Sequence, residues 1–448
     1  MKTKMCSLSL IVMLVLVLAG LGNTSVAGAQ PLATDQNIPP FTARDASQFN
    51  AEVPVAWFDL AYDLVREESL SPPVASRIFG YLGVALYEAL VPGMPSYQSL
   101  AGQLNDLQPL PKPADRAYHW PTIANSVLAA TLEKLLNTES SSTQIHALEE
   151  QFSREFKPGL PPGVYKRSVE RGQAISHVIM QWAASDGYES YKNCPYLPPS
   201  GAGLWQPTPP GFRPPLLPCW GKLRPFVLNN GSECSPSPPV TYSEDPDSEF
   251  YQEALEVYNV VNHLNSEQLA IAQFWADSPG QTGTPPGHSI SILSQILIQE
   301  RSSLETAAEA YARVGIALAD SFIACWQTKY QHNLLRPITY IHKVLGDTGW
   351  TTPVVTPPFP EYPSGHSVQS SATAQVLTDM FGEVVFTDNT HASLGYAPRI
   401  FISFFDFAEE AAISRLYGGI HYRAAIERGL EQGRCIGQRV NALEFKTP

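Results

Sequence analysis

Cysteine, charge and long apolar runs are all scarce in this chain. Its 448 residues include six cysteines, none of them in a Cys-x-x-Cys pair, so nothing indicates a structural zinc site. Only 16% of the residues are charged, and 42 acidic residues outnumber 29 lysines and arginines to give a net charge of −13. Such an acidic balance disfavours binding to nucleic acid. Beyond residue 29 we expect no apolar run long enough to span a bilayer.

The first 29 residues have the pattern of a secretory signal peptide. Lys2 and Lys4 provide a basic start, residues 9–18 are apolar, and residues 27–29 are small. This order is typical of a leader that is cleaved after residue 29. The sequence therefore predicts a secreted or periplasmic protein with no membrane attachment after cleavage. If cleavage failed, the same segment would act as a membrane anchor.

The rest of the chain shows helical periodicity and no convincing alternating strand pattern. Helical stretches recur through residues 30–194 and again through 243–448, and a proline-rich connector, residues 195–242, separates them. The pattern predicts an all-α fold of two packed helical bundles, with residues 1–29 removed as the signal peptide. A connector of this length is expected to wrap the surface or to shape the entrance of a pocket.

Five cysteines remain after loss of the signal peptide. Cys194, Cys219 and Cys234 lie in or beside the connector, and in an exported protein a disulfide between two of them is expected. Sequence alone does not determine which two. Cys325 and Cys435 fall on predicted helices, where a cysteine commonly serves as a small buried hydrophobe.

Two cations mark the first of three motifs. Lys329 and Arg336 are seven residues apart, and Pro337 follows directly. Seven residues make about two helical turns, so both side chains would lie on one helix face roughly 10 Å apart. Pro337 disfavours helix at the preceding residue, which places Arg336 near a helix end. The two side chains could converge on one anion, or could simply be solvated on a surface helix.

The second motif consists of Ser364, Gly365 and His366, followed by a stretch of helical composition. At a helix N-terminus, free backbone N–H groups and the macrodipole favour an anion. Ser364 can donate its hydroxyl, and Gly365 lets an anion approach the main chain. The alternative is an ordinary capped turn with a solvated histidine.

The third motif places Arg415 and His421 on either side of the pair Gly418-Gly419. The glycines are expected to end one helix before the next begins, which can point both side chains at a common site. Arginine presents a planar fork to two oxygens of an oxyanion. A neutral histidine nitrogen can be a metal ligand or a nucleophile. Otherwise His421 would be hydrogen-bonded within a helical hairpin.

The order and spacing of these motifs resemble those of the vanadium-dependent haloperoxidases and the type 2 phosphatidic acid phosphatases, which share one oxyanion site. The resemblance implies that vanadate is the cofactor and that phosphate can occupy the same site. His421 would be the protein ligand to vanadium, and His366 the acid–base residue. The oxygens of the anion would be bound by Lys329, Arg336, Ser364, Gly365 and Arg415. Lys329 would also act catalytically, by drawing electron density from bound peroxide.

Further positions extend the resemblance or depart from it. Trp326 and Phe359 match aromatic residues that line the halide pocket of fungal chloroperoxidases, although their spacing alone suggests core residues. Many family members carry an aspartate four residues after the last histidine, where this chain has Ala425. Without that carboxylate, His421 would depend on a backbone carbonyl for its orientation. Asp277, close in sequence to His288, could be the partner of one of the arginines.

The resemblance implies an exported haloperoxidase that uses hydrogen peroxide to oxidise halide to hypohalous acid, with an organic acceptor as a further partner. The alternative is a phosphohydrolase with His421 as nucleophile, which the absence of the usual aspartate at position 425 weakens. A third hypothesis is an oxyanion-binding protein without catalysis. The halide, the acceptor and the oligomeric state are left open by the sequence.

Overall fold

A computed structural model describes residues 44–447, so the predicted signal peptide lies outside the described residues. The described residues belong to one compact unit, Phe41–Pro448. Helices make up 59% of the structure and strands 4%, which confirms the all-α prediction. The predicted boundaries of the two halves at residues 194/195 and 242/243 stay predictions.

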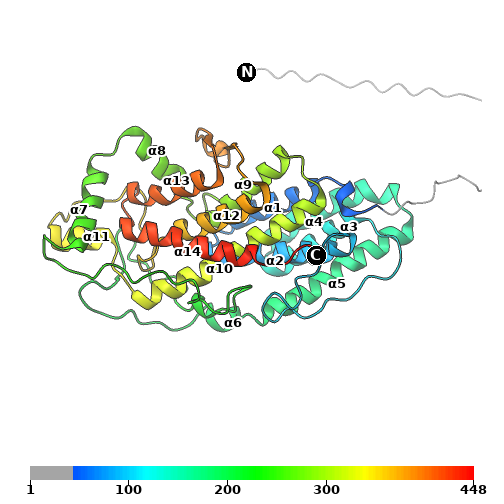
Figure 1. Ribbon diagram of the computed structural model, residues 1–448, viewed down its shortest axis with the longest axis horizontal. Coiled ribbons are helices and arrows are strands. Elements are labelled where there is room, and N and C mark those ends of the chain that lie inside the picture. The colour runs from blue at the N-terminus through cyan, green and yellow to red at the C-terminus, as the bar shows by residue number, and fades with distance from the viewer. Residues whose placement is uncertain (1–43, 448) are drawn as a thin grey trace, which may run out of the picture. The chain divides into compact units, whose positions relative to one another are not determined.

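Figure 1 shows the helices of the described residues. They are α1 (Glu52–Glu67), α2 (Pro72–Leu90), α3 (Trp120–Leu136), α4 (Glu139–Phe156), α5 (Pro162–Ala184), α6 (Tyr188–Tyr191), α7 (Glu249–Asn262), α8 (Ser266–Phe274), α9 (Thr284–Gln299), α10 (Leu304–His332), α11 (Pro337–Tyr340), α12 (Gly365–Phe381), α13 (Phe404–Tyr417) and α14 (Arg423–Asn441). The strands β1 (Phe386–Asp388) and β2 (Arg399–Phe401) form an antiparallel hairpin. Three-residue strands are too short to leave an alternating pattern, so the sequence did not reveal them.

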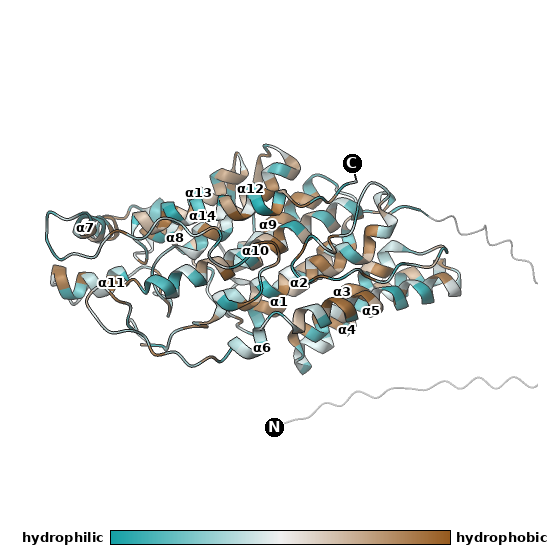
Figure 2. Ribbon diagram, turned by 60° about the horizontal axis from the view of Figure 1, so that its bottom comes forward, coloured by the Kyte–Doolittle hydropathy of each residue, from teal (hydrophilic) through white to brown (hydrophobic). Residues whose placement is uncertain are grey.

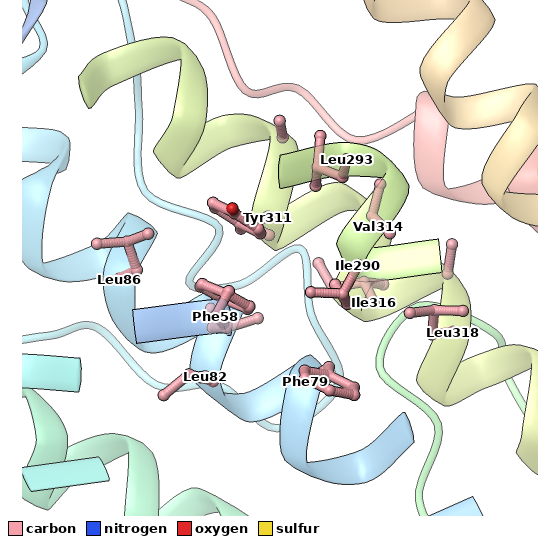
Figure 3. Close-up of a cluster of buried hydrophobic side chains, with 14 of the residues drawn as sticks. Phe58, Phe79, Leu82, Leu86, Ile290, Leu293, Tyr311, Val314, Ile316 and Leu318 are labelled. Atoms are coloured by element: carbon pink, nitrogen blue, oxygen red, sulfur yellow. The ribbon is translucent and has the colours of Figure 1, made fainter. Parts of the chain in front are cut away.

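The packing of α10 against α2 forms the centre of the core (Figure 3). Phe58 of α1 stacks on Tyr311 of α10 with ring centroids 3.7 Å apart. Gly83 of α2 allows the two backbones to approach, because a Cβ there would lie 2.3 Å from the backbone oxygen of Tyr311. Gly315 of α10 does the same from the other side, where a Cβ would lie 2.5 Å from the oxygen of Phe79. Small residues at such a crossing hold α10, and the side chains at its C-terminal end, rigidly in place.

The apolar helix α2 corrects one expectation from the sequence. The stretch Pro72–Gly93 is long and apolar enough to cross a membrane, by length and composition only; Figure 2 colours α2 by hydropathy. The absence of such a stretch after residue 29 was therefore wrongly predicted. Most of this stretch is buried within the protein. A helix that is apolar on all sides is typical of a protein core, where other helices surround it. We therefore interpret α2 as a core helix.

The C-terminal helices form the second part of the architecture that matters for the site. Helix α12 packs against α10, α13 and α14, and Figure 1 shows α12, α13 and α14 beside one another in orange to red. The β1–β2 hairpin connects α12 to α13. The ends of α10, α12 and α13 therefore lie near one another, although they are up to about 90 residues apart in the chain.

The predicted connector is held to the helices at several points. A disulfide joins Cys194 to Cys219, which confirms that two of the three nearby cysteines pair. A second disulfide joins Cys234 to Cys435 of α14, so the prediction that Cys435 is a free buried thiol was wrong. Spacing could not show this pairing, because the two cysteines are 201 residues apart. Cys325 is free and buried, as predicted.

The connector also closes one side of a cavity, as one of the two expectations for it proposed. The carboxylate of Asp320 on α10 accepts hydrogen bonds from the backbone N–H groups of Phe226, Val227 and Leu228 at 2.6–3.0 Å. The backbone oxygen of Leu216 accepts a hydrogen bond from the indole Nε1 of Trp326 at 3.2 Å. These contacts hold the connector along α10, beside the cavity described next.

Candidate active site

The second and third motifs line one cavity of about 550 Å³, and Arg336 of the first motif contacts His421 beside it. Gly365, His366, Arg415 and His421 line it directly. They come from the start of α12, the end of α13 and the segment between α13 and α14. Residues from sequence-distant motifs thus lie around one cavity.

The relation between Lys329 and Arg336 differs from the prediction. Helix α10 ends at His332, because Asn333 adopts a left-handed conformation with φ of 49° as its C-cap. Arg336 has an extended backbone and is the N-cap of α11. The two cations are therefore not on one helix face, although Arg336 does lie at a helix end as Pro337 predicted.

Lys329 is completely buried and fully hydrogen-bonded. Its Nζ donates to the backbone oxygens of Pro360 at 3.0 Å, Glu361 at 2.9 Å and Pro363 at 2.5 Å. Three donors meet three acceptors, so Lys329 holds the loop before Ser364 in its conformation. Burial lowers the pKa of Lys329 to about 7. A direct contact between Lys329 and an oxyanion stays a prediction.

The arginines, in contrast, keep donors without partners. Arg336 donates from Nε to the oxygen of Phe359 at 2.9 Å and from Nη1 to the oxygen of Ile420 at 2.8 Å. Its Nη2 has no hydrogen-bond partner among the described residues, and neither does Nε of Arg415. Arg415 donates from Nη1 to the oxygen of Trp275 at 2.6 Å. Burial lowers the pKa of each arginine to about 10, so both stay cationic at neutral pH.

The second motif forms the N-terminus of α12. Ser364 is the N-cap, and its hydroxyl oxygen accepts from the backbone N–H of Ser367 at 3.3 Å. Gly365 is the first helical residue and lines the cavity. A Cβ at Gly365 would meet nothing closer than Cys325 Sγ at 3.8 Å. The glycine therefore leaves open space above free N–H groups at the positive end of a helix.

His421 has a carboxylate partner that the sequence did not reveal. Its Nδ1 lies 2.7 Å from Oε1 of Glu361, which also accepts from the backbone N–H of Tyr422 at 3.0 Å. Nε2 of His421 accepts from Nη1 of Arg336 at 3.1 Å. Burial first, and then the neighbouring cations, keep the pKa of His421 far below its usual value. The ring is therefore neutral, with its proton on Nδ1 and its lone pair on Nε2.

Glu361 corrects the interpretation of Ala425. The side chain of Ala425 is buried, and its backbone oxygen accepts from the N–H of Ser364 at 3.0 Å. Glu361 takes over the orienting role that an aspartate at position 425 was expected to have. Its signal in the sequence is an acidic residue within the apolar, proline-rich stretch before Ser364. Burial raises the pKa of Glu361 to about 8, and the positive charges of Arg336 and Lys329 oppose this rise.

His366 lines the cavity in the first turn of α12. Its side chain is 13% exposed, and its Nε2 is 3.7 Å from Oδ2 of Asp277. This nitrogen has no hydrogen-bond partner among the described residues. Burial and the charge of Arg415 lower the pKa of His366 to about 4, while Asp277 opposes the change. Above this pH the ring is neutral and can accept a proton.

Asp277 has partners other than the one predicted. Its carboxylate meets Nδ1 of His288 at 3.0 Å and Nε2 of His391 at 3.1 Å. Its charge also influences Arg415, but no hydrogen bond or ion pair joins the two within the described part of the chain. The prediction that Asp277 pairs with an arginine was therefore wrong. The loop between α8 and α9 places Asp277 against His288 and His391. The spacing of residues in the sequence could not show this arrangement.

Trp326 and Phe359 line the cavity together with other apolar residues. Their ring centroids are 4.8 Å apart. The guanidinium of Arg336 lies 5.0 Å from the ring of Phe359, a distance at which the aromatic face attracts a cation. These rings exclude water from one wall of the site, and their contact with a halide stays a prediction.

With this geometry described, comparison with known proteins becomes informative. The crystal structure of a bacterial vanadium-dependent iodoperoxidase is similar to this chain, with 38% sequence identity and a TM-score of 0.84 over 89% of this chain and 98% of that one. The chain belongs to the vanadium-dependent haloperoxidase family.

Other similarities agree at lower identity. The holo-type and apo-type structures of a bacterial vanadium-dependent chloroperoxidase both have TM-scores of 0.67 at 18% and 16% identity, covering 84% and 89% of this chain and 92% and 98% of theirs. These two similarities show a common fold. A family model described as the second helical-bundle domain of VCPO matches residues 309–446. Vanadium chloroperoxidase of Curvularia inaequalis is 26% identical over 198 residues, which cover 37% of this chain and only 32% of that enzyme.

The residues present fit the oxyanion that the family name implies. Two buried guanidinium groups keep unpartnered N–H donors, and no carboxylate forms an ion pair with either of them in the described part of the chain. Buried charges normally require a partner. A tetrahedral anion between the arginines, the α12 N-terminus and the Nε2 lone pair of His421 would supply it.

Proposed function

We propose that this protein is a haloperoxidase that uses vanadate to oxidise halide with hydrogen peroxide. The reaction consumes one halide ion, one hydrogen peroxide and one proton and yields hypohalous acid and water. The observation that carries the proposal is the pair of buried arginines with free donors beside a neutral His421. The similarity to a bacterial iodoperoxidase over most of both chains supports it.

Each residue has a defined task in this proposal. Arg336, Arg415 and the N–H of Gly365 would bind the oxygens of vanadate, as would the hydroxyl of Ser364. Nε2 of His421 would be the ligand to vanadium. When bound, vanadate supplies a Lewis acid that activates peroxide. Glu361 keeps the proton of His421 on Nδ1, so that Nε2 keeps its lone pair.

His366 would move the protons of the reaction. It lines the cavity, and its neutral ring can take a proton from peroxide and later return it to the departing oxygen. Its lowered pKa of about 4 keeps it in the accepting form at neutral pH. Lys329 would strengthen the positive field behind the anion, an effect that is largest where water is excluded.

The phosphohydrolase alternative remains because of one specific observation. The Glu361–His421 contact of 2.7 Å is the arrangement that activates a histidine nucleophile. The argument from the missing aspartate at position 425 therefore no longer counts against phosphate ester hydrolysis. The site would bind phosphate through the same donors, because phosphate and vanadate are both tetrahedral oxyanions.

Export is also part of the proposal. The signal-like residues 1–29 motivate it, and the disulfides Cys194–Cys219 and Cys234–Cys435 are typical of proteins that fold in an oxidising compartment. Mass analysis of the protein recovered from outside the cytoplasm should give a chain that begins at residue 30. Recovery of an uncleaved chain in the cytoplasm would contradict this part.

A pair of assays on one preparation tests the function. The vanadate-loaded protein should oxidise iodide or bromide in the presence of peroxide, and the protein without vanadate should hydrolyse a phosphate ester slowly or not at all. Phosphatase activity that exceeds peroxidase activity would favour the alternative. Tight vanadate binding with neither activity would leave a non-catalytic oxyanion-binding protein and overturn the proposal.

A further inference from the structure

A second cluster of buried titratable groups lies behind His366. It consists of Asp277, His288, Asp388 and His391, which we call the histidine–aspartate network. All four side chains are at most 3% exposed. They come from the loop after α8, from α9, from β1 and from the turn after β1. Such a concentration of charge in a core requires a physical reason.

The geometry determines the charge of His288. Its Nδ1 faces the carboxylate of Asp277 at 3.0 Å, and its Nε2 faces Oδ2 of Asp388 at 2.8 Å. A neutral imidazole has one donor and one acceptor nitrogen, and an acceptor facing a carboxylate would be repelled. Both nitrogens of His288 must therefore donate, which makes the ring an imidazolium. The two carboxylates raise its pKa to about 10 against the effect of burial.

An aromatic ring adds an independent indication of this charge. Trp275 stacks on His288 with centroids 4.4 Å apart and an interplanar angle of 19°. A cation over an indole face is attracted to the ring. The backbone oxygen of Trp275 accepts the hydrogen bond from Arg415. The same short segment thus connects the imidazolium to a cation of the anion site.

Asp277 connects the network to His366. Its backbone has a φ of 45°, a left-handed conformation that the surrounding structure must hold in place. Its Oδ1 accepts from His391 and its Oδ2 lies 3.7 Å from Nε2 of His366. Asp388 is held from its other side, where Oδ1 accepts from the backbone N–H of Thr390 at 2.9 Å. The bridge is therefore anchored at both ends.

We propose that Asp277, His288 and Asp388 form a permanent carboxylate–imidazolium–carboxylate bridge that positions His366 for its acid–base step. His288 and Asp388 contact neither the anion donors nor the reacting atoms, so they are positioning residues. Asp277 is the carboxylate that faces the ring of His366, with Oδ2 3.7 Å from Nε2, and His288 keeps Asp277 ionised and in place. The role in turnover rests on the proposed function, whereas the bridge itself does not.

The charged and titratable groups around His366 are Asp277, His288, Arg415 and His421. Arg415 and the neutral His421 belong to the anion site. Asp277 is the only anion in this set. Its ionisation depends on a counter-ion within the core, because an isolated buried carboxylate would take up a proton. His288 is that counter-ion. Loss of His288 should therefore also change the environment of His366, because Asp277 faces that ring.

The first experiment examines the bridge without any reaction. The full chain is labelled with ¹⁵N in its histidines and studied by NMR in the absence of vanadate, with the signals of His288 assigned from the variant His288→Gln. Both ring nitrogens of His288 should be protonated throughout pH 5 to 9. A His288 that is neutral at pH 7 would overturn the proposal, whatever the activity of the enzyme.

The second experiment measures turnover per bound vanadate in His288→Gln and Asp388→Asn. Both variants should retain vanadate within about twofold of the native protein, because neither residue touches the anion donors. His288→Gln should lower kcat by about 10-fold or more, with a smaller loss for Asp388→Asn. The KM for peroxide should change little. His177→Gln, an exposed histidine on α5, is the matched control and should behave like the native protein.

The outcomes separate the bridge from a merely structural role. If His288→Gln does not fold, Asp388→Asn decides the question, because it keeps the shape of the side chain and removes one charge. Lower thermal stability with unchanged kcat per vanadate in both folded variants would overturn the positioning role. Absence of peroxidase activity in the native protein would refute the proposed function, and the NMR result would still decide whether the bridge exists.

Discussion

Two buried groups of charges meet at the cavity, and they differ in how their charges are satisfied. The anion site contains Arg336 and Arg415, each with a donor nitrogen that has no partner among the described residues. In the histidine–aspartate network, both ring nitrogens of His288 face carboxylates at 2.8–3.1 Å. The charge of His288 is paired with two carboxylates within the protein, whereas the anion site lacks a negative partner for its arginines among the described residues.

This difference distinguishes a binding site from its support. An unpaired buried cation costs free energy, and a bound anion offsets that cost. An imidazolium that is already paired with carboxylates has little unfavourable free energy for a bound ligand to offset. We therefore expect ligands and substitutions in the anion site to change binding, and substitutions in the network to change turnover through His366. The predictions below test this contrast, from the largest expected effect to the smallest.

His421→Ala should abolish stable vanadate retention. The substitution removes the lone pair on Nε2 and leaves Glu361 as a buried carboxylate without its ring partner. Metal analysis after dialysis measures the retained vanadium. His342→Ala serves as the control, because His342 is hydrogen-bonded to the backbone oxygen of Trp350, outside the site. Retention at native affinity in His421→Ala would contradict the assignment of the ligand.

His366→Ala should keep vanadate and lose most of its turnover. A general acid–base group contributes about 10²–10⁴-fold, and His366 forms no hydrogen bond to Arg336, Arg415 or His421 that its loss would break. Steady-state rates per bound vanadate give the answer. A rate equal to that of the native protein would place the proton transfer elsewhere and would also remove the reason for the network.

Arg415→Ala should weaken vanadate and phosphate together by roughly 1.5–3 kcal/mol, the value of a hydrogen bond to a charged group. Titration calorimetry of each anion measures this, and the two anions should compete for one site. Arg428→Ala is the matched control, since Arg428 is partly exposed, lies outside the cavity lining and pairs with Glu431. Simultaneous binding of vanadate and phosphate would refute the common site.

Glu361→Gln should reduce vanadate affinity by about 10–100-fold, as loss of a carboxylate behind a ligating histidine commonly does. The amide oxygen can still accept from His421, but the variant lacks the carboxylate charge that Glu361 gains as the pH rises through its pKa of about 8. In the same experiment Ala425→Asp should not restore affinity, because Ala425 is buried and a carboxylate there would lack a counter-ion. Restoration by Ala425→Asp would show that the interpretation of Glu361 is wrong.

The smallest effect expected is a pH dependence of anion binding. Lys329 has a pKa of about 7 in the protein without a bound anion, so it is cationic below pH 7 and loses its charge as the pH rises. Glu361, with a pKa of about 8, gains negative charge over a slightly higher range. Both changes disfavour an anion at high pH. Sulfate, whose charge is constant from pH 6 to 9, should therefore bind a few-fold more weakly at pH 9, and Lys329→Met should reduce this slope.

The helical class of the fold was predictable from the sequence. Helix periodicity is a local property, and it indicated helices throughout the part of the chain that contains α10, α12 and α13. The short β1–β2 hairpin was missed, and with it Asp388. Lys329 and Arg336 were predicted on one helix, because nothing in the spacing indicated that Asn333 would end α10 with a left-handed cap.

By itself, the sequence determined the family resemblance, the helical class and the residues that could bind an oxyanion, because these depend on spacing and on the chemistry of each side chain. Only the tertiary structure decided the pairings. Glu361 meets His421 across 60 residues, Asp388 meets His288 across 100, and Cys234 joins Cys435 across 201. Such contacts depend on how helices pack, and many different partners are compatible with the same local pattern. Packing therefore determined which charges are paired within the protein and which remain available to an anion.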